Sequence, residues 1–405
     1  MATPQEPRIA RVISVQGQTV KLSCAGQRWA AVTTEAVEVG DWVDCSDPKA
    51  LEIVHRPARP LRASDDWSRM NADGARRMWA LRERAVVLEE IRSVLRARGL
   101  LEVETPAMAR CPGLELHLDA VGVDLREGMG GALTRRWLVT SPEFHMKRLL
   151  SAGSGPIFQI AKAFRSGERG HWHNPEFTML EWYRDGQDYR ALLDDFVALL
   201  TRCSEALGEL RQAHGRPGDV RRPPPLLLVS FAEALQRWAK VDVAQQSVAQ
   251  LRQHCREAGF DVRDGDDEAT VLTQVLVEGV EPRLPSEQLI AIDRWPASLA
   301  SLAQRRPDEP TLADRFEVYW GATELANGFN ELVDPAEQRA RFRGDLSARA
   351  ATGRPEYPID ERFINALEAG CPPSAGVAVG VDRVLMVLGG YDDIDDVLAF
   401  PFERA

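Results

Sequence analysis

The stretch FRSGERGHWHNPEFTMLEWY, residues 164–183, decides how the rest of the chain is interpreted. The apolar runs on either side, PIFQIAKAF and EFTMLEWY, predict two strands joined by a hairpin. Polar side chains crowd the loop and the returning strand: Arg165, Glu168, Arg169, His171, His173, Asn174, Glu176, Glu181 and Tyr183. Composition alone slightly favours a solvated, charge-decorated hairpin, so a functional interpretation needs support from elsewhere in the chain.

That support lies downstream. Glu324 and Glu331 fall on another predicted strand, in ELANGFNE, and Arg383 follows Gly380 where a helix should begin. Joining a carboxylate to the α-phosphate of ATP requires positioned cations and a divalent metal, and little covalent chemistry from the protein. Arg165 suits a bidentate clamp on the α-phosphate, and Arg383 suits the terminal phosphate. The two glutamates offer hard oxygen ligands for Mg²⁺.

The same residue types also have an ordinary structural explanation. A lone arginine or glutamate on a strand is more often a surface or salt-bridging residue. The pattern by itself leaves that alternative open.

The remaining elements predict an α+β domain with an antiparallel sheet. Residues 75–98 repeat apolar positions at spacings of three and four before Gly99, which predicts a long amphipathic helix. A short strand, LEVETP, follows it, and Ser141-Pro142-Glu143 has the residue types that begin a helix. Further helices are predicted near 231–239, 246–259, 268–278 and 335–350. Strands are predicted in EQLIAID and RFEVYWGATELANGFNEL, and GVAVGVDRVLMVLGG predicts a strand that turns into an apolar helix.

The N-terminal part has a different pattern. Residues 8–54 alternate β-rich segments with turns, which predicts a small β-barrel or sandwich of four or five strands, and HRPARPLRASDD predicts a linker. We therefore expect a β-module at 1–56, a linker at 57–74 and a catalytic domain at 75–405 with a helical insertion at about 207–285.

Bulk properties limit the possible functions. The 50 Lys and Arg against 61 Asp and Glu give a net charge of -11, which argues against a whole surface shaped for nucleic acid. No apolar run approaches the roughly 20 residues of a membrane span, and the N-terminus lacks the apolar stretch of a signal peptide. The six cysteines are scattered, without a CxxC pair. These features predict a cytoplasmic protein with reduced thiols and no membrane association.

Several of these segments resemble a known family. FR followed by HNPEFTMLEWY resembles motif 2 of class II aminoacyl-tRNA synthetases, and GVAVGVDRVLM resembles motif 3. LRERAVVLEEIRSVLRARGLLEVETP resembles motif 1, which forms the class II dimer interface. TSPEFHMKRLL and ELANGFNEL are similar to the lysyl branch. ASLASLA and RFEVYW, with an N-terminal module too short for the usual anticodon-binding barrel, bring the chain closest to the elongation factor P (R)-β-lysine ligase family, the lysyl-tRNA synthetase paralogues.

The resemblance implies a role for each matching residue. The lysine site is implied to contain Ser141, Pro142, Glu143, Tyr183, Glu331 and Ala378. ATP is implied to contact Arg165, Ser166, Gly167, Glu168, Asn174, Phe177, Glu324, Leu325, Gly380 and Arg383, with Arg165 and Arg383 as the catalytic pair. The expected Mg²⁺ ligands are Glu324 and Glu331.

Two positions depart from the family pattern. Gly167 stands where the family's FRxE has glutamate, so the adenine contact is expected either from Glu168 after a loop shift or from the backbone of Gly167. Ala378 stands where lysyl-tRNA synthetases typically have glycine. Its methyl group would disfavour α-lysine relative to the β-isomer, although neutral packing drift explains the alanine nearly as well.

The resemblance therefore implies a homodimeric enzyme that uses ATP and Mg²⁺ to activate (R)-β-lysine, or lysine, and transfers it to a lysine of elongation factor P. One alternative is a small lysyl-tRNA synthetase-like enzyme. It requires a basic N-terminal face, but only Arg8, Arg11, Lys21 and Arg28 serve that face before residue 49, so tRNA is not the expected partner. Another alternative is a non-catalytic binding or regulatory protein, which should have lost the nucleotide ligands that are present here. The N-terminal module is expected to dock a protein or RNA, or to act as a stabilising cap.

Overall fold

The structure is a computed structural model that describes residues 9–24, 27–47, 50–60, 62, 64–126, 128–216, 218–243 and 247–405, without the side chains of residues 73 and 74. The chain forms two compact units, Met1–Ala85 with Asp395–Ala405, and Val86–Ile394. The domain boundaries expected from the sequence stay a prediction, and Arg8 lies outside the described residues.

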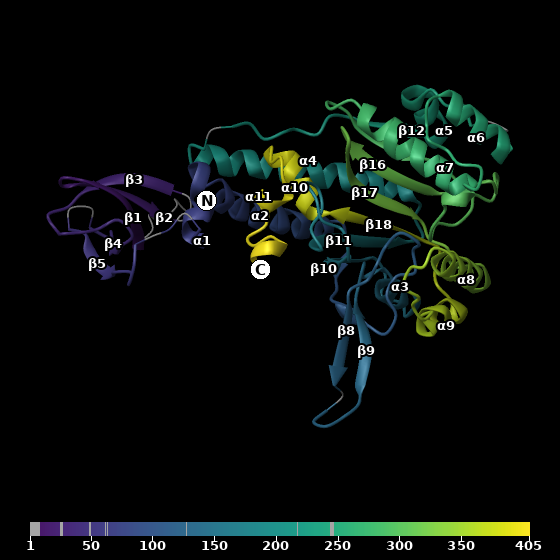
Figure 1. The fold of residues 1–405 in the computed structure, drawn as a ribbon, viewed down its shortest axis with the longest axis horizontal. Helices are drawn as coiled ribbons and strands as arrows, with labels where there is room; N and C mark the ends of the chain where they lie inside the picture. The colour runs from purple at the N-terminus through teal and green to yellow at the C-terminus, as the bar shows by residue number, and fades with distance from the viewer. Residues whose placement is uncertain are drawn as a thin grey trace. The chain divides into compact units, whose positions relative to one another are not determined.

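The first unit contains an antiparallel sheet of five strands in the order β3-β2-β1-β4-β5 (Figure 1). Residues of alternating positions, such as Ala10, Val12, Val20 and Leu22, are fully buried and form its apolar core, as expected for strands with one buried face. The small all-β module predicted from the sequence is therefore confirmed. Its strands are β1 (Ile9–Gln16), β2 (Thr19–Cys24), β3 (Gln27–Val32), β4 (Trp42–Asp44) and β5 (Glu52–His55).

Short helices complete this unit. The helix α1 (Asp66–Met70) and the 3-10 turn η5 (Phe402–Arg404) are joined by an ion pair of 3.4 Å between Asp66 and Arg404. The helices α2 (Ala72–Ala97) and α11 (Ile394–Val397) each have residues in both units.

The second unit is built on an eight-stranded sheet in the order β12-β13-β16-β17-β18-β11-β10-β6. All neighbours are antiparallel except β12 with β13 and β6 with β10. This sheet confirms the α+β, class II synthetase-like architecture predicted from the sequence. Its strands are β6 (Leu101–Glu102), β10 (Ile157–Phe164), β11 (Glu176–Asp185), β12 (Leu226–Ser230), β13 (Leu289–Asp293), β16 (Arg315–Trp320), β17 (Thr323–Asn330) and β18 (Ser374–Gly380).

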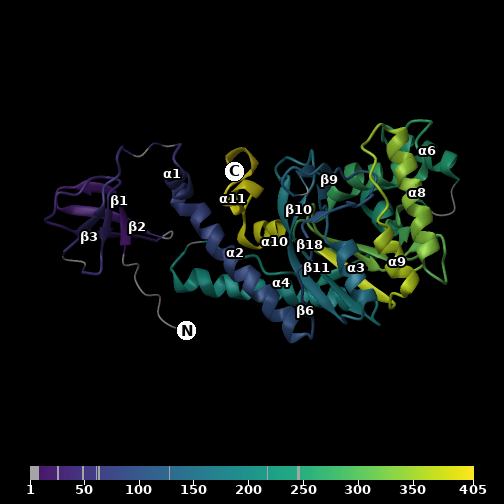
Figure 2. The same cartoon turned by 90° about the horizontal axis from the view of Figure 1, so that it is seen from below.

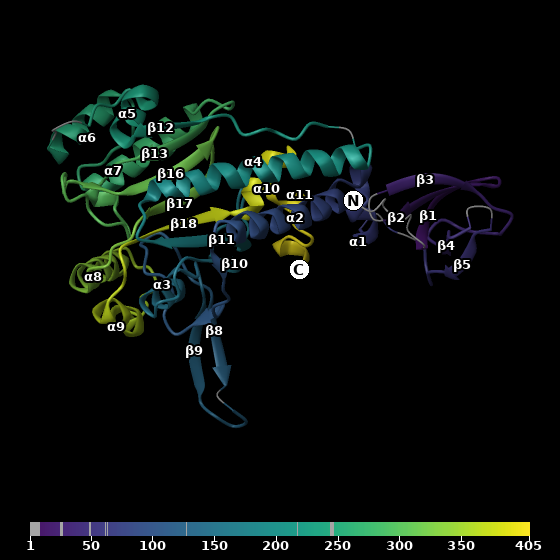
Figure 3. The ribbon, with the colours of Figure 1, turned by 180° about the vertical axis from the view of Figure 1, so that it is seen from behind.

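Two helices cover one face of this sheet, α4 (Tyr189–Ala213) and α10 (Val381–Gly389) (Figure 3). Phe316, on β16, points to this face and stacks on Tyr189 at the start of α4, with 5.6 Å between ring centroids. Because side chains alternate along a strand, the neighbours of Phe316 point to the opposite face. That opposite face carries the candidate site.

Three helices stand at one end of the sheet, α3 (Glu143–Ser151), α8 (Pro335–Ala351) and α9 (Glu361–Ala369) (Figure 2). They are joined by Phe144, Phe342 and Phe363, and the rings of Phe144 and Phe363 stack at 4.8 Å. The second unit also contains two smaller sheets, formed by β7 (Met108–Ala109), β8 (Gly122–Arg126) and β9 (Leu133–Leu138), and by β14 (Trp295–Pro296) and β15 (Leu312–Ala313).

The apolar side chains of the insertion form a buried cluster together with residues of the main sheet, such as Ile290, Ile292 and Tyr319. The predicted helices are present, but β12 was not predicted, because the preceding proline-rich segment suggested a connection rather than a strand. Since β12 pairs with β13, part of the insertion extends the main sheet. Its helical elements are α5 (Phe231–Ala234), η1 (Leu235–Ala239), α6 (Val248–Glu257), α7 (Glu268–Gln274), η2 (Val275–Val280) and η3 (Glu281–Arg283), and η4 (Ala297–Leu299) follows β14.

Among the helices that the described residues form, none combines the length and the apolar character that a bilayer span requires.

Candidate active site

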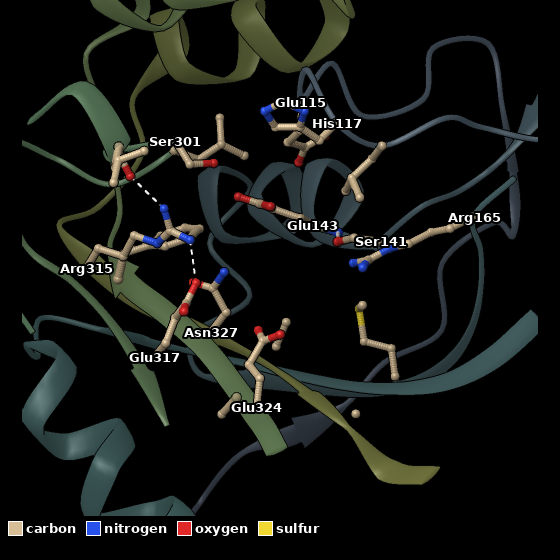
Figure 4. Close-up of a pocket in the computed structure, with 18 of the residues that line it drawn as sticks. Glu115, His117, Ser141, Glu143, Arg165, Ser301, Arg315, Glu317, Glu324 and Asn327 are labelled. Atoms are coloured by element: carbon tan, nitrogen blue, oxygen red, sulfur yellow. Dashed lines mark hydrogen bonds and ion pairs between the residues drawn. The ribbon is translucent and has the colours of Figure 1, made fainter. Parts of the chain in front are cut away.

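A pocket of about 700 Å³ lies on the face of the large sheet opposite α4 (Figure 4). Its floor follows from strand register. Glu181 pairs with Ala378, Ala378 with Asn327, and Asn327 with Glu317. Residues directly opposite one another in an antiparallel sheet share a face. A row of side chains therefore crosses four strands along the pocket floor, with a carboxylate at each end.

A β-bulge adds Glu324 to this floor. In the β16–β17 ladder Val318 pairs with Ala326 and Tyr319 pairs with Glu324, which leaves Leu325 as the extra residue. An extra residue reverses the alternation of side chains beyond it. Glu324 consequently shares the face of Asn327 and lines the same pocket.

The central strand of the floor, β18, has small residues at the positions that face the pocket: Gly376, Ala378 and Gly380. A Cβ atom at Gly376 would collide with the ring of Tyr183 and the carboxylate of Glu331. Glycine at this position is what allows those two side chains to meet.

The structure brings most of the predicted residues together. Within the described part of the chain, the pocket lining includes Ser141, Glu143, Arg165, Glu168, Asn174, Phe177, Tyr183, Glu324, Leu325, Glu331, Ala378, Gly380 and Arg383.

Pro142, Ser166 and Gly167 are not part of this lining. Pro142 is the N-cap residue of α3 and so fixes the direction of Glu143. The backbone N–H of Ser166 donates to the carbonyl of Asp119 at 2.7 Å, and Gly167 takes a positive φ of 82°. These residues shape the loop next to Arg165, and their contacts to ATP stay a prediction. The lining position of Glu168 favours it over Gly167 for the adenine contact.

One end of the pocket gathers carboxylates around a buried ammonium group. Lys147, one turn after Glu143 on α3, has a side chain that is 1% exposed, and it forms ion pairs with Glu143 at 2.5 Å and with Glu331. Burial alone lowers the pKa of Lys147, but these two carboxylates outweigh burial and raise it. Burial raises the pKa of Glu331 in spite of Lys147. Lys147 therefore links the carboxylates of Glu143 and Glu331 at this end of the pocket.

Glu181 forms the second group of contacts at this end. Its carboxylate accepts hydrogen bonds from Ser141 Oγ at 2.5 Å and from the Tyr183 hydroxyl at 2.9 Å. Burial, and then the charge of Glu143, raise the pKa of Glu181 to about 8. A bound ammonium ion would reverse this shift, because an opposite charge favours the ionised carboxylate. The arrangement suits an ammonium group of a substrate.

The other end of the pocket carries the two predicted arginines. Arg165 lies over the ring of Phe177 at 5.1 Å and reaches Glu168 at 3.8 Å. Its Nε is buried and has no hydrogen-bond partner among the described residues. Arg383, at the start of α10, donates to Glu324 Oε2 at 3.1 Å. Both arginines line one cavity, as adenylate chemistry requires.

The expectation that Glu324 and Glu331 bind Mg²⁺ together is wrong for Glu331. Glu324 and Glu331 lie seven residues apart along β17 and its end, which separates their Cα atoms by roughly 20 Å, too far for one ion to contact both. Glu331 instead pairs with Lys147. The neighbour of Glu324 across the floor is Glu317, whose pKa is raised first by burial and also by the charge of Glu324.

Glu317 and Glu324 fit a Mg²⁺ ion. Arg315 forms an ion pair of 2.5 Å with Glu317 and so neutralises part of its charge. The Oδ1 atom of Asn327, which lines the pocket with Glu317 and Glu324, is buried without a hydrogen-bond partner among the described residues. No group of three or more His, Cys, Asp or Glu side chains in the described residues could hold a metal. Mg²⁺ needs only one or two carboxylates when phosphates and water complete its shell.

Sequence reasoning missed Glu115, Lys147, Arg315 and Glu317, and gave Glu181 no role. Glu317 was detectable, because it lies two residues from Arg315 and Tyr319 on a predicted strand and so shares their face. Lys147 was detectable as the residue four positions after Glu143 on the same helix. Glu115 comes from an irregular segment, which carries no periodicity from which its direction could be derived.

The fold and the pocket together define an enzyme of the class II synthetase type. Residues 65–404 match the family model described as tRNA synthetases class II (D, K and N). A protein of Vibrio cholerae named elongation factor P (R)-β-lysine ligase is 44% identical over 330 residues, which cover 80% of this chain and 96% of that protein. Proteins of the same name from Haemophilus influenzae and Klebsiella pneumoniae are 40% and 41% identical over 80% of this chain and 95% of their own lengths. The chain therefore belongs to the class II tRNA synthetase family, in the group of the elongation factor P (R)-β-lysine ligases.

Proposed function

We propose that this protein activates (R)-β-lysine with ATP and transfers it to a lysine side chain of elongation factor P. The observation that carries the proposal is a single cavity with phosphate-binding arginines at one end and ammonium-binding carboxylates at the other. The names of the relatives supply the substrate and the acceptor.

Activation forms one bond and breaks another. A carboxylate oxygen of the amino acid attacks the α-phosphorus of ATP, and the bond from that phosphorus to pyrophosphate breaks. Arg165 stabilises the charge that develops on the α-phosphate, and Arg383 holds the terminal phosphates. Glu317 and Glu324 would hold Mg²⁺, which would neutralise phosphate charge.

In the second step, the amine of the acceptor lysine attacks the carbonyl carbon of the adenylate. AMP leaves, the attacking nitrogen loses a proton, and an amide bond remains. Glu143, Glu181 and Tyr183 hold the ammonium groups of the amino acid throughout. Its carboxylate therefore stays positioned next to the α-phosphate that Arg165 binds. We also propose that the enzyme is cytoplasmic and homodimeric, with motif 1 at the dimer interface.

The exchange of labelled pyrophosphate into ATP tests the activation step. We expect exchange that depends on (R)-β-lysine and is weaker with α-lysine. An absence of exchange with either isomer would contradict the proposal and favour a binding or regulatory protein.

Replacing Ala378 with glycine should shift the preference toward α-lysine. Ala378 pairs with Glu181 and Asn327 in the centre of the floor, so its methyl group occupies space beneath the substrate. One methyl group in a pocket changes selectivity by about 1 to 3 kcal/mol, or roughly 10-fold or more. The ratio of kcat/KM for the two isomers measures the shift. An unchanged ratio in Ala378→Gly would assign the alanine to packing alone.

A further inference from the structure

The charges at the carboxylate end of the pocket do not balance. Glu115, Glu143, Glu181 and Glu331 all line it, and the buried Lys147 supplies an ammonium group to two of them. Lys147 pairs with Glu143 and Glu331. A diamino acid brings two further ammonium groups, which Glu181 alone would not neutralise. Glu115 is the carboxylate that the function described above does not use.

Glu115 points into the pocket and faces Glu143, as Figure 4 shows. Its Oε2 atom is buried and has no hydrogen-bond partner among the described residues. Burial, followed by the charge of Glu143, raises the pKa of Glu115 to about 7. A buried carboxylate oxygen without a partner costs free energy unless a ligand supplies one. A cation placed between Glu115 and Glu143 would satisfy both.

The segment that carries Glu115 is held in place before any substrate binds. Arg349, which is fully buried, donates to the carbonyls of Glu115 at 2.8 Å and Leu118 at 2.9 Å, and to the carboxylate of Asp119 at 2.6 Å. Gly113 leaves the space that Glu115 occupies, because a Cβ atom there would overlap the Glu115 carboxylate. A side chain supported in this way is pre-organised for binding.

We propose that Glu115 binds the second ammonium group of the diamino acid, the one next to Glu143, and thereby makes the enzyme select diamino over monoamino acids. The inference rests on the proposed function and adds to it a specificity-determining residue. Glu181, Tyr183 and Glu331 then serve the ammonium group at the far end of the substrate chain, while Glu115 and Glu143 serve the amine near the carboxylate.

The test uses 6-aminohexanoic acid, which has the carbon chain of (R)-β-lysine but lacks its second amine. In pyrophosphate exchange, the KM for (R)-β-lysine and the inhibition constant of 6-aminohexanoic acid are measured for wild type, Glu115→Gln and Glu115→Asp. We expect Glu115→Gln to raise the KM for (R)-β-lysine about 10- to 100-fold and to leave the inhibition constant unchanged. Glu115→Asp keeps the carboxylate and should retain most of the discrimination.

Glu361→Gln is the matched control, because Glu361 is exposed on α9 and pairs with Arg339. It should behave as wild type. An equal weakening of both ligands by Glu115→Gln would show a merely structural role, and an unchanged KM would show no role; either result overturns the inference. A wild-type enzyme that activates neither lysine isomer would instead contradict the proposed function, so the two failures are distinguishable.

Discussion

Replacing Arg165 with alanine should reduce pyrophosphate exchange by about 100- to 1000-fold, the usual cost of one donor that stabilises charge in a transition state. The backbone of Arg165 closes the hairpin through a hydrogen bond from its N–H to the carbonyl of Pro175 at 2.9 Å, and alanine keeps this bond. The lost side-chain contacts are the one with the Phe177 ring and the long pair with Glu168. The fold should therefore persist, with a thermal midpoint close to that of wild type.

Arg169→Ala provides a control on the same loop. Arg169 is exposed, donates to the carbonyls of Gly170 and His173, and is not among the described residues that line the pocket. It should exchange at the wild-type rate. Wild-type exchange in Arg165→Ala, with ATP binding intact, would refute the assignment of Arg165 to the α-phosphate.

Replacing Lys147 with methionine should give the largest loss of stability, about 3 to 5 kcal/mol, because it leaves two buried carboxylates without their cation. The loss should depend on pH. Burial already raises the folded-state pKa of Glu331 in spite of Lys147, and loss of the ammonium group should raise it further above its unfolded value of about 4.3. A carboxyl group shifted in this direction loses stability as pH rises from the unfolded pKa to the folded pKa. The free energy of unfolding of the variant should therefore be lower at about pH 8 than at about pH 5.5.

Lys162→Met is the matched comparison. Lys162 pairs with Glu176 at 3.3 Å, but both side chains are about half exposed, and pairs of this kind contribute roughly 0 to 1 kcal/mol. Urea unfolding of both variants at the two pH values measures the difference. If Lys147→Met unfolded at the same urea concentration as Lys162→Met, the ammonium group of Lys147 would have no structural role.

The sequence was sufficient for the elements and for much of the pocket. The hairpin at 157–185 and the final strand and helix were predictable, because their apolar periodicity matches their packing in the sheet. Arg165 and Arg383, more than two hundred residues apart in the chain, were expected in one cavity, and the structure places both there.

What failed was the assignment of partners across strands. Glu324 was paired with Glu331 because both lie in ELANGFNEL, whereas the ladder brings Glu324 beside Tyr319 and near Glu317. The pairing depends on the register between β16 and β17 and on a bulge at Leu325, and neither has a local sequence signal. Lys147 was overlooked for a related reason: its burial depends on Glu331, from a strand far along the chain.

The most direct test of the account follows labelled (R)-β-lysine after activation. The enzyme is incubated with ATP, Mg²⁺ and the labelled amino acid, and the mixture is offered elongation factor P and lysine tRNA. We predict that the label becomes attached to elongation factor P through an amide bond, and that Arg165→Ala abolishes the transfer. Label on the tRNA alone would contradict the account.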